Sequence, residues 1–125
     1  MMVTLTMPMP PSLNNAFVNI KRGRRKSKAH EAWASEADWK IRAQRPIPVA
    51  GRVVLEWVFG WKEISKLSDL SNRIKLAEDA LVAAGVIDDD RFIESFQARK
   101  DYQSTDVQVS IFKFIKIKEN FSSFF

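Results

Sequence analysis

Residues 69–90 hold the side chains of this chain whose types and spacing could carry out a reaction. Asp69 opens the stretch, Lys75 and Asp79 lie within it, and the acidic run 88–90 closes it. Carboxylates that share one place repel each other unless a cation lies among them. That cation could be Lys75 itself, or Mg²⁺, which prefers hard oxygen ligands. In a basic protein, a small acidic cluster of this kind is typical of a metal-dependent enzyme that acts on nucleic acid.

A helix over residues 71–84 would place Asn72, Lys75 and Asp79 on one stripe, because residues three, four and seven apart share a side of a helix. That stripe would lie opposite the apolar face of the helix. The simpler interpretation of Lys75 is a surface ion pair with Asp79, which contributes only about 0.3–0.5 kcal/mol. The residues alone leave both interpretations open.

Two further parts of the cluster depend on the backbone at the ends of this helix. In an extended segment Asp69 and Ser71 would point the same way, since side chains two apart share a face. A turn after Gly85 can bring Asp89 and Asp90 back toward the helix. The alternative is that these carboxylates are solvated charges near the helix ends, because polar clusters are common in turns.

Positive charge is concentrated near the start of the chain. The formal net charge is +5, and residues 1–50 alone carry +6. Residues 21–28 contain six basic side chains and one glycine, which predicts an exposed loop. Such cations can neutralise phosphates and give salt-sensitive binding to nucleic acid; the candidates are Arg22, Arg24, Arg25, Lys26 and Lys28. The alternative is a solvated loop or a localisation-like tract.

Hydrophobic periodicity predicts a single α/β (α+β) domain over residues 1–125, with elements in the order β-α-β-α-β-β. We expect a mixed four-strand sheet with two helices. The strands are predicted over 3–7, 52–61, 91–100 and 105–115, and the helices over 28–44 and 71–84. Ser27 is suited to cap the first helix. The tryptophans are expected in the core except Trp61, and His30 is expected at the surface. The tail 120–125 is expected to pack against the body or to contact a partner.

The composition excludes several classes of site. With no cysteine and only one histidine, the chain lacks the residues for a disulfide, a thiol nucleophile, cysteine-ligated zinc or a histidine-rich metal site. Its first residues have neither the basic nor the apolar region of a signal peptide, and no apolar run reaches the roughly 20 residues that span a bilayer. We therefore expect a soluble, cytoplasmic protein with no membrane partner.

The spacing within residues 69–90 resembles that of a known enzyme family. The run Asp-x-Ser-Asn-x-x-Lys-x-x-x-Asp-Ala-Leu, followed by Gly and then Asp-Asp, is similar to the core of the RusA-type Holliday junction resolvases. Residues 10–14, Pro-Pro-Ser-x-Asn, are similar to that family's PPSxN segment. The resemblance implies a RusA-like fold and a Mg²⁺-dependent, structure-selective DNA endonuclease. It also implies a homodimer that resolves four-way junctions by paired symmetric nicks.

The same resemblance assigns roles to individual residues. It implies that Asp69 and Asp90 are catalytic and bind the metal, and that Lys75 is catalytic. The supporting positions are Ser71, Asn72, Asp79 and Asp89, and Asn14 joins the DNA-binding set.

One position departs from the family pattern. The family's second aspartate is Ser71 here, which supplies no negative charge. Either Asp88 or Asp89 compensates, or metal binding and cleavage are weakened. Two alternatives therefore remain beside an active endonuclease: a junction-binding protein with impaired turnover, and a general nucleic-acid-binding module.

Overall fold

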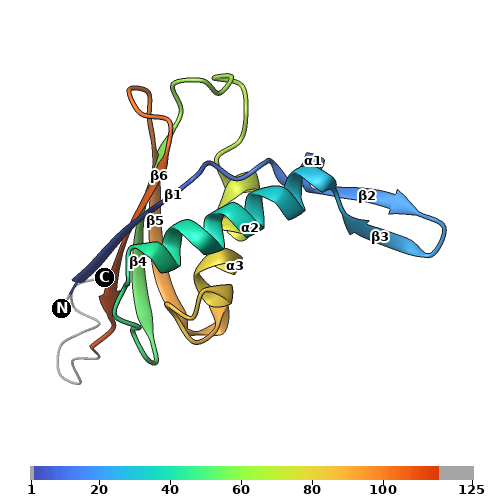
Figure 1. Cartoon of the computed structure of the whole chain (residues 1–125). Coiled ribbons are helices and arrows are strands. Elements are labelled where there is room, and N and C mark those ends of the chain that lie inside the picture. The colour runs from blue at the N-terminus through green and yellow to red at the C-terminus, as the bar shows by residue number, and fades with distance from the viewer. Residues whose placement is uncertain (1, 116–125) are drawn as a thin grey trace.

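The structure, a computed structural model, describes residues 2–115 and is built around a mixed four-strand sheet (Figure 1). Its strands lie in the order β1 (Met2–Met7), β6 (Val107–Lys113), β4 (Val53–Gly60) and β5 (Ile93–Asp101). β6 pairs antiparallel with β1 and with β4, whereas β4 and β5 are parallel. The predicted fold class is confirmed. The expectation for the tail 120–125 lies outside the described residues.

Alternation along the strands determines which face of the sheet is buried. In β4, Val53, Leu55, Trp57 and Phe59 are buried, while the residues between them are partly or fully exposed. β6 repeats the pattern with Val107, Val109 and Ile111 buried. Side chains two apart share a face, so both strands bury the same side of the sheet, the side covered by the helices.

Two longer helices, α2 (Lys28–Ala43) and α3 (Ser71–Ala83), lie on one side of the sheet (Figure 1). Ser27 caps α2, since its hydroxyl accepts a hydrogen bond from the backbone N–H of His30 at 3.1 Å. α3 buries five side chains against the core, Ile74, Leu76, Ala77, Ala80 and Leu81. Gly85, with φ of 74°, follows its end. None of the helices within residues 2–115 is both long and apolar enough to cross a membrane.

Residues 13–26 differ from the prediction. Leu13–Ala16 form a one-turn helix, α1, and an antiparallel hairpin follows, made of β2 (Phe17–Ile20) and β3 (Gly23–Lys26). The hairpin projects away from the sheet (Figure 1), and we call residues 17–26 the arm. The prediction of a loop for the basic run was therefore wrong for β3. All four β3 residues are exposed, so the strand lacks the alternation by which a half-buried strand is identified.

The expectations for His30 and Trp61 were wrong. His30 is 5% exposed, and its ring contacts Phe17 edge-on with ring centres 5.2 Å apart. Trp61 is 1% exposed, and its indole N–H donates to the carbonyl oxygen of Ser65 at 3.0 Å. Trp39 is instead the tryptophan at the surface, at 69% exposed.

Candidate active site

Helix α3 places Lys75 between two carboxylates. The Lys75 ammonium lies 3.1 Å from Asp79 Oδ1, one turn further along the helix, and 2.5 Å from Asp90 Oδ2. The predicted surface pair with Asp79 is therefore present, and Asp90 joins it from the far side of the α3–β5 turn. These three side chains come together as the sequence suggested.

Asp69 and Asn72 form the neighbouring part of the site. The Asn72 amide nitrogen donates to Asp69 Oδ2 at 3.5 Å, a long contact. Asn72 and Lys75 are three residues apart on α3 and so lie on one side of the helix. The residues form a strip along α3, from Asp69 through Asn72 to the cluster of Lys75, Asp79 and Asp90. We call this the acidic strip.

The ion pairs shift the pKa values of the residues in this cluster. Hydrogen bonds to Asp90 and then to Asp79 raise the pKa of Lys75 above its ordinary value. The hydrogen bond from Lys75, and next the one from Asp89, lower the pKa of Asp90. The side chains of Lys75, Asp79 and Asp90 remain 49%, 53% and 41% exposed. Exposed ion pairs are weakly held, so Lys75 can exchange its carboxylate partner for another anion.

The three aspartates of the acidic run have different partners. Asp88 Oδ2 accepts a hydrogen bond from the backbone N–H of Gly51 at 2.9 Å, in the loop between α2 and β4. Asp89 Oδ1 accepts from the backbone N–H of Arg91 at 3.1 Å and caps the short 3-10 helix η1 (Asp90–Phe92). Asp90 is the member of the run that meets Lys75.

The expected geometry at Ser71 was wrong. Leu70, which stands between Asp69 and Ser71, has φ of −63° and ψ of −43° and is helical, not extended. The side-by-side arrangement of Asp69 and Ser71 is therefore absent. Ser71 is four residues before Lys75 on α3, so its side chain shares the side of the helix that carries Lys75.

Two cavities border the acidic strip. One, of about 240 Å³, is lined by Asp69 and Asn72 together with Ser12 and Asn14 of the Pro-Pro-Ser-x-Asn segment. The other, of about 470 Å³, is lined by Glu78, Asp90 and Glu94. The fold thus brings Asn14 to Asp69, although they are far apart in the sequence. Asp69 and Asp90 border different cavities.

The carboxylate oxygens of the acidic strip are of the type that Mg²⁺ prefers, but they do not surround a single metal position. Within residues 2–115, no three Asp, Glu or His side chains converge to hold a metal ion. Mg²⁺ usually keeps several waters and is bound through one or two carboxylates plus substrate phosphates. Asp69 and Asp90 are oxygen donors of this kind, but they border different cavities, so water and a phosphate would have to complete the coordination of an ion bound at either one.

Sequence reasoning missed Arg73, a cation that positions the acidic strip. Its Nη1 donates to the carbonyl oxygen of Pro10 at 2.6 Å, and its guanidinium lies 5.5 Å from the centre of the Trp61 ring. Arg73 thereby fixes the start of α3 against the Pro10–Asn14 segment. The contact with Pro10 spans 63 positions of the sequence, and no local pattern signals it.

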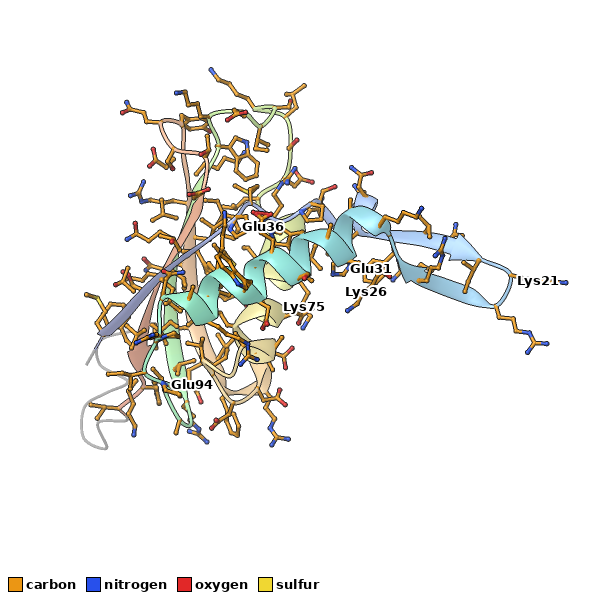
Figure 2. The ribbon with its side chains drawn as sticks, in the orientation of Figure 1. Lys21, Lys26, Glu31, Glu36, Lys75 and Glu94 are labelled. Carbon is orange, nitrogen blue, oxygen red and sulfur yellow. The ribbon has the colours of Figure 1, made fainter. Side chains whose placement is uncertain are left out.

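The basic side chains predicted to bind DNA lie mostly on the arm. Arg24 and Lys26 pair across the hairpin with Asn19 and Phe17, and the Arg24 guanidinium lies 4.8 Å from the centre of the Phe17 ring. Figure 2 shows Lys21 at the tip of the arm and Lys75 on the body of the protein. Arg22, Arg25 and Lys28 are also exposed.

The root of the arm is tied to α2. The Ser27 hydroxyl donates to the carbonyl oxygen of Asn15 at 2.9 Å, and the Ser27 backbone N–H donates to that of Ala16 at 2.8 Å. His30 Nδ1 lies 3.0 Å from the same Ala16 oxygen. The arm is therefore positioned relative to the body, although its strands are exposed.

Comparison with known proteins agrees with this architecture. Residues 8–112 match the family described as endodeoxyribonuclease RusA. The match covers β4, β5 and nearly all of β6, both long helices, the arm and the acidic strip, and it begins directly after β1. No curated protein matches the chain in sequence. On the extent of the family match, the chain belongs to the RusA endodeoxyribonuclease family.

Proposed function

We propose that the protein is a Mg²⁺-dependent endonuclease that resolves four-way DNA junctions in the cytoplasm, with the acidic strip as its active site. The observation that supports this best is the cluster in which Lys75 contacts both Asp79 and Asp90. It joins a cation of α3 to one carboxylate on the same helix and to another in η1, within the part of the chain that matches the endonuclease family. In this proposal Asp69 and Asp90 hold the metal, and Asn72, Asp79 and Asp89 support them.

The proposed chemistry is hydrolysis of a phosphodiester, which resists attack because its negative charge repels nucleophiles. When bound, Mg²⁺ supplies polarisation of the phosphoryl oxygens and acidifies a water. Lys75 is placed to stabilise the charge that develops on the phosphoryl group or on the leaving oxygen. Because its ion pairs are exposed, an arriving phosphate can replace Asp90 as its partner. Asp90, released from Lys75, is then free to bind metal.

The proposal includes a homodimer. A four-way junction is resolved by two symmetric nicks, and the acidic strip provides one site in each chain. A two-fold axis supplies the second site by placing an identical chain on the other side of the junction. The arm of each chain would then reach a different part of the DNA.

The test compares purified protein on a four-way junction and on a duplex of matched sequence, with Mg²⁺ and with EDTA. We expect paired nicks in the junction with Mg²⁺, none with EDTA, and little cleavage of the duplex. Junction binding without nicking would favour the weakened protein that Ser71 suggests. Equal binding to both DNAs without nicking would contradict the proposal and favour a general nucleic-acid-binding module.

Replacement Ser71→Asp should lower the Mg²⁺ concentration that gives half-maximal nicking. Position 71 lies one helical turn before Lys75, so an added carboxylate would join the side of α3 that already carries Lys75. Mg²⁺ relies on few protein carboxylates, and an additional one should strengthen its binding. Titration of Mg²⁺ against nicking rate checks this. A higher requirement in the variant would show that Ser71 does not occupy the place of a missing ligand.

Replacement Lys75→Met should raise the pH at which Mg²⁺ affinity begins to fall as the solution is acidified; we call this fall the acid limb of Mg²⁺ binding. Lys75 lowers the pKa of Asp90, so its removal lets that pKa return toward the ordinary carboxylate value of about 4. The wild-type protein should therefore keep its metal affinity to lower pH than the variant. Mg²⁺ titrations by calorimetry between about pH 3 and 6, without DNA, measure the shift.

The matched control for Lys75→Met is Lys40→Met. Lys40 also pairs with an acid one turn away, Glu36, at 3.1 Å on the exposed side of α2. Its removal should leave the acid limb unchanged. A shift of equal size in both variants would show that general charge, and not the contact with Asp90, sets the pH dependence.

A further inference from the structure

The loop before α3 presents a leucine to solvent beside the acidic strip. Leu67 is 94% exposed, more than any other large apolar side chain within residues 2–115. Two residues later the chain reaches Asp69, and both residues line the cavity of about 240 Å³. The most solvent-exposed apolar group of the described chain therefore stands at the rim of the candidate active site.

Hydrogen bonds from neighbouring residues hold the turn that carries Leu67 in place. Trp61, which is buried, donates from its indole N–H to the carbonyl oxygen of Ser65 at 3.0 Å. The Lys100 ammonium donates to the carbonyl oxygen of Ser68 at 3.1 Å and lies 4.6 Å from the centre of the Trp61 ring. The Leu67 backbone N–H donates to the Ser65 hydroxyl at 3.2 Å. The exposure of Leu67 thus belongs to a fixed turn.

The cavity beside Leu67 is small and polar, as a site for a single nucleobase would be. Its volume of about 240 Å³ is below the roughly 300 Å³ at which pockets for drug-sized ligands begin. Its walls carry the charged side chains of Asp69 and Arg73 and also amides and hydroxyls, which come from Asn14, Asn15, Asn72, Ser12 and Ser68. A side-chain amide both donates and accepts hydrogen bonds, as the edge of a nucleobase does.

A single exposed leucine is common on protein surfaces and carries no inference alone. A protein partner would require a contiguous apolar patch, whereas Leu67 stands between Lys66 and Ser68 in the sequence. Apolar wedges that enter between DNA bases are typically single leucine, isoleucine, methionine or phenylalanine side chains. The polar surroundings and the adjacent acidic strip therefore favour DNA over a protein partner.

We propose that Leu67 is a wedge that enters between bases next to the scissile phosphate of a branched DNA. The base it displaces enters the amide-lined cavity, which brings its phosphate toward Asp69. Separating stacked bases costs a few kcal/mol and costs least where pairing is already interrupted. The wedge would thus favour branch points over intact duplex. This inference rests on the proposed function, since it needs a protein that binds and cuts branched DNA.

The experiment uses four-way junctions with 2-aminopurine, which fluoresces more strongly when unstacked, placed in turn at each base next to the cleavage site. Full-length protein is added in EDTA, so that no cleavage occurs. We expect a severalfold rise in fluorescence at one of these positions with wild-type protein and with Leu67→Met. The rise should disappear with Leu67→Ser. Ile47→Ser, which alters another exposed apolar side chain at 66% exposure, should behave as wild type.

The outcomes separate this inference from the proposed function. Two results would contradict the wedge and leave the proposed nuclease function intact. In one, wild-type protein nicks the junction but 2-aminopurine fluorescence rises at none of the positions. In the other, Leu67→Ser raises the fluorescence as much as wild type does. If the protein neither binds nor nicks branched DNA, the proposed function fails and the wedge fails with it. Leu67 is so exposed that Leu67→Ser should fold normally, which its melting temperature verifies.

Discussion

We expect Asp90→Asn to abolish the proposed Mg²⁺-dependent nicking and to leave junction binding in EDTA intact or tighter. Asp90 is the acidic residue that meets Lys75 from the α3–β5 turn, and that contact lowers the pKa of its carboxyl. A bound metal contributes several kcal/mol to transition-state stabilisation, and about 1.4 kcal/mol corresponds to a tenfold change in rate. We therefore expect the rate to fall about a hundredfold or more, and Asp69→Asn to behave likewise. Nicking rates with saturating junction measure the decrease.

Binding should persist in these variants because each removes a negative charge that would face the DNA phosphates. Asp88→Asn is the matched control, since Asp88 belongs to the same acidic run but bonds to the backbone of Gly51. It should nick at close to the wild-type rate. The metal site would lie elsewhere if Asp69→Asn and Asp90→Asn nicked at the wild-type rate, or if Asp88→Asn lost its nicking activity.

The second large effect concerns the arm. Replacing Arg22, Arg24, Arg25 and Lys26 together by glutamine should weaken DNA binding by orders of magnitude at low salt. Removing one cation that neutralises a phosphate should reduce the slope of log K against log salt by about 0.9 for duplex arms. If all four cations bind phosphates, the slope falls by about 3.6. Fluorescence anisotropy over a series of salt concentrations measures both quantities.

A matched control removes the same charge from the body. Lys40, Arg45, Arg52 and Arg99 are exposed, and their joint replacement by glutamine lowers the net charge by the same amount. This control should change the slope much less. Equal changes in the two variants would mean that net charge, and not the arm, attracts the DNA. An unchanged slope in the arm variant would leave the arm as a solvated hairpin.

The sheet and the two long helices were predictable because their burial follows simple periods. β4 buries every second residue from Val53 to Phe59, and α2 buries positions 30, 33, 37 and 41. The same helical period placed His30 on the buried side of α2, a signal that the prediction did not apply. Trp61 continues the alternation of β4, and that pattern also indicated its burial. The arm carried no such signal, because its strands lie outside the core.

The candidate site was predictable along α3 and not beyond it. The spacing of Lys75 and Asp79 determined their contact, because four residues make about one turn of a helix. The partner of each aspartate in the acidic run depends instead on the backbone of the α3–β5 turn. There Asp88 reaches Gly51, Asp89 caps η1 and Asp90 reaches Lys75. Likewise, one helical residue, Leu70, changed the expected relation of Asp69 to Ser71.

The parallel pairing of β4 with β5 requires α3 to cross from one end of the sheet to the other. Asp69, Lys75, Asp79 and Asp90 all lie within that one connection, whereas the arm lies entirely before α2. Catalysis and DNA affinity are therefore proposed for two separate stretches of the chain, joined where Arg73 holds the Pro10–Asn14 segment. Mutation or recombination could then lengthen, shorten or recharge the arm without disturbing the carboxylates. Relatives could change their DNA preference while keeping the same chemistry.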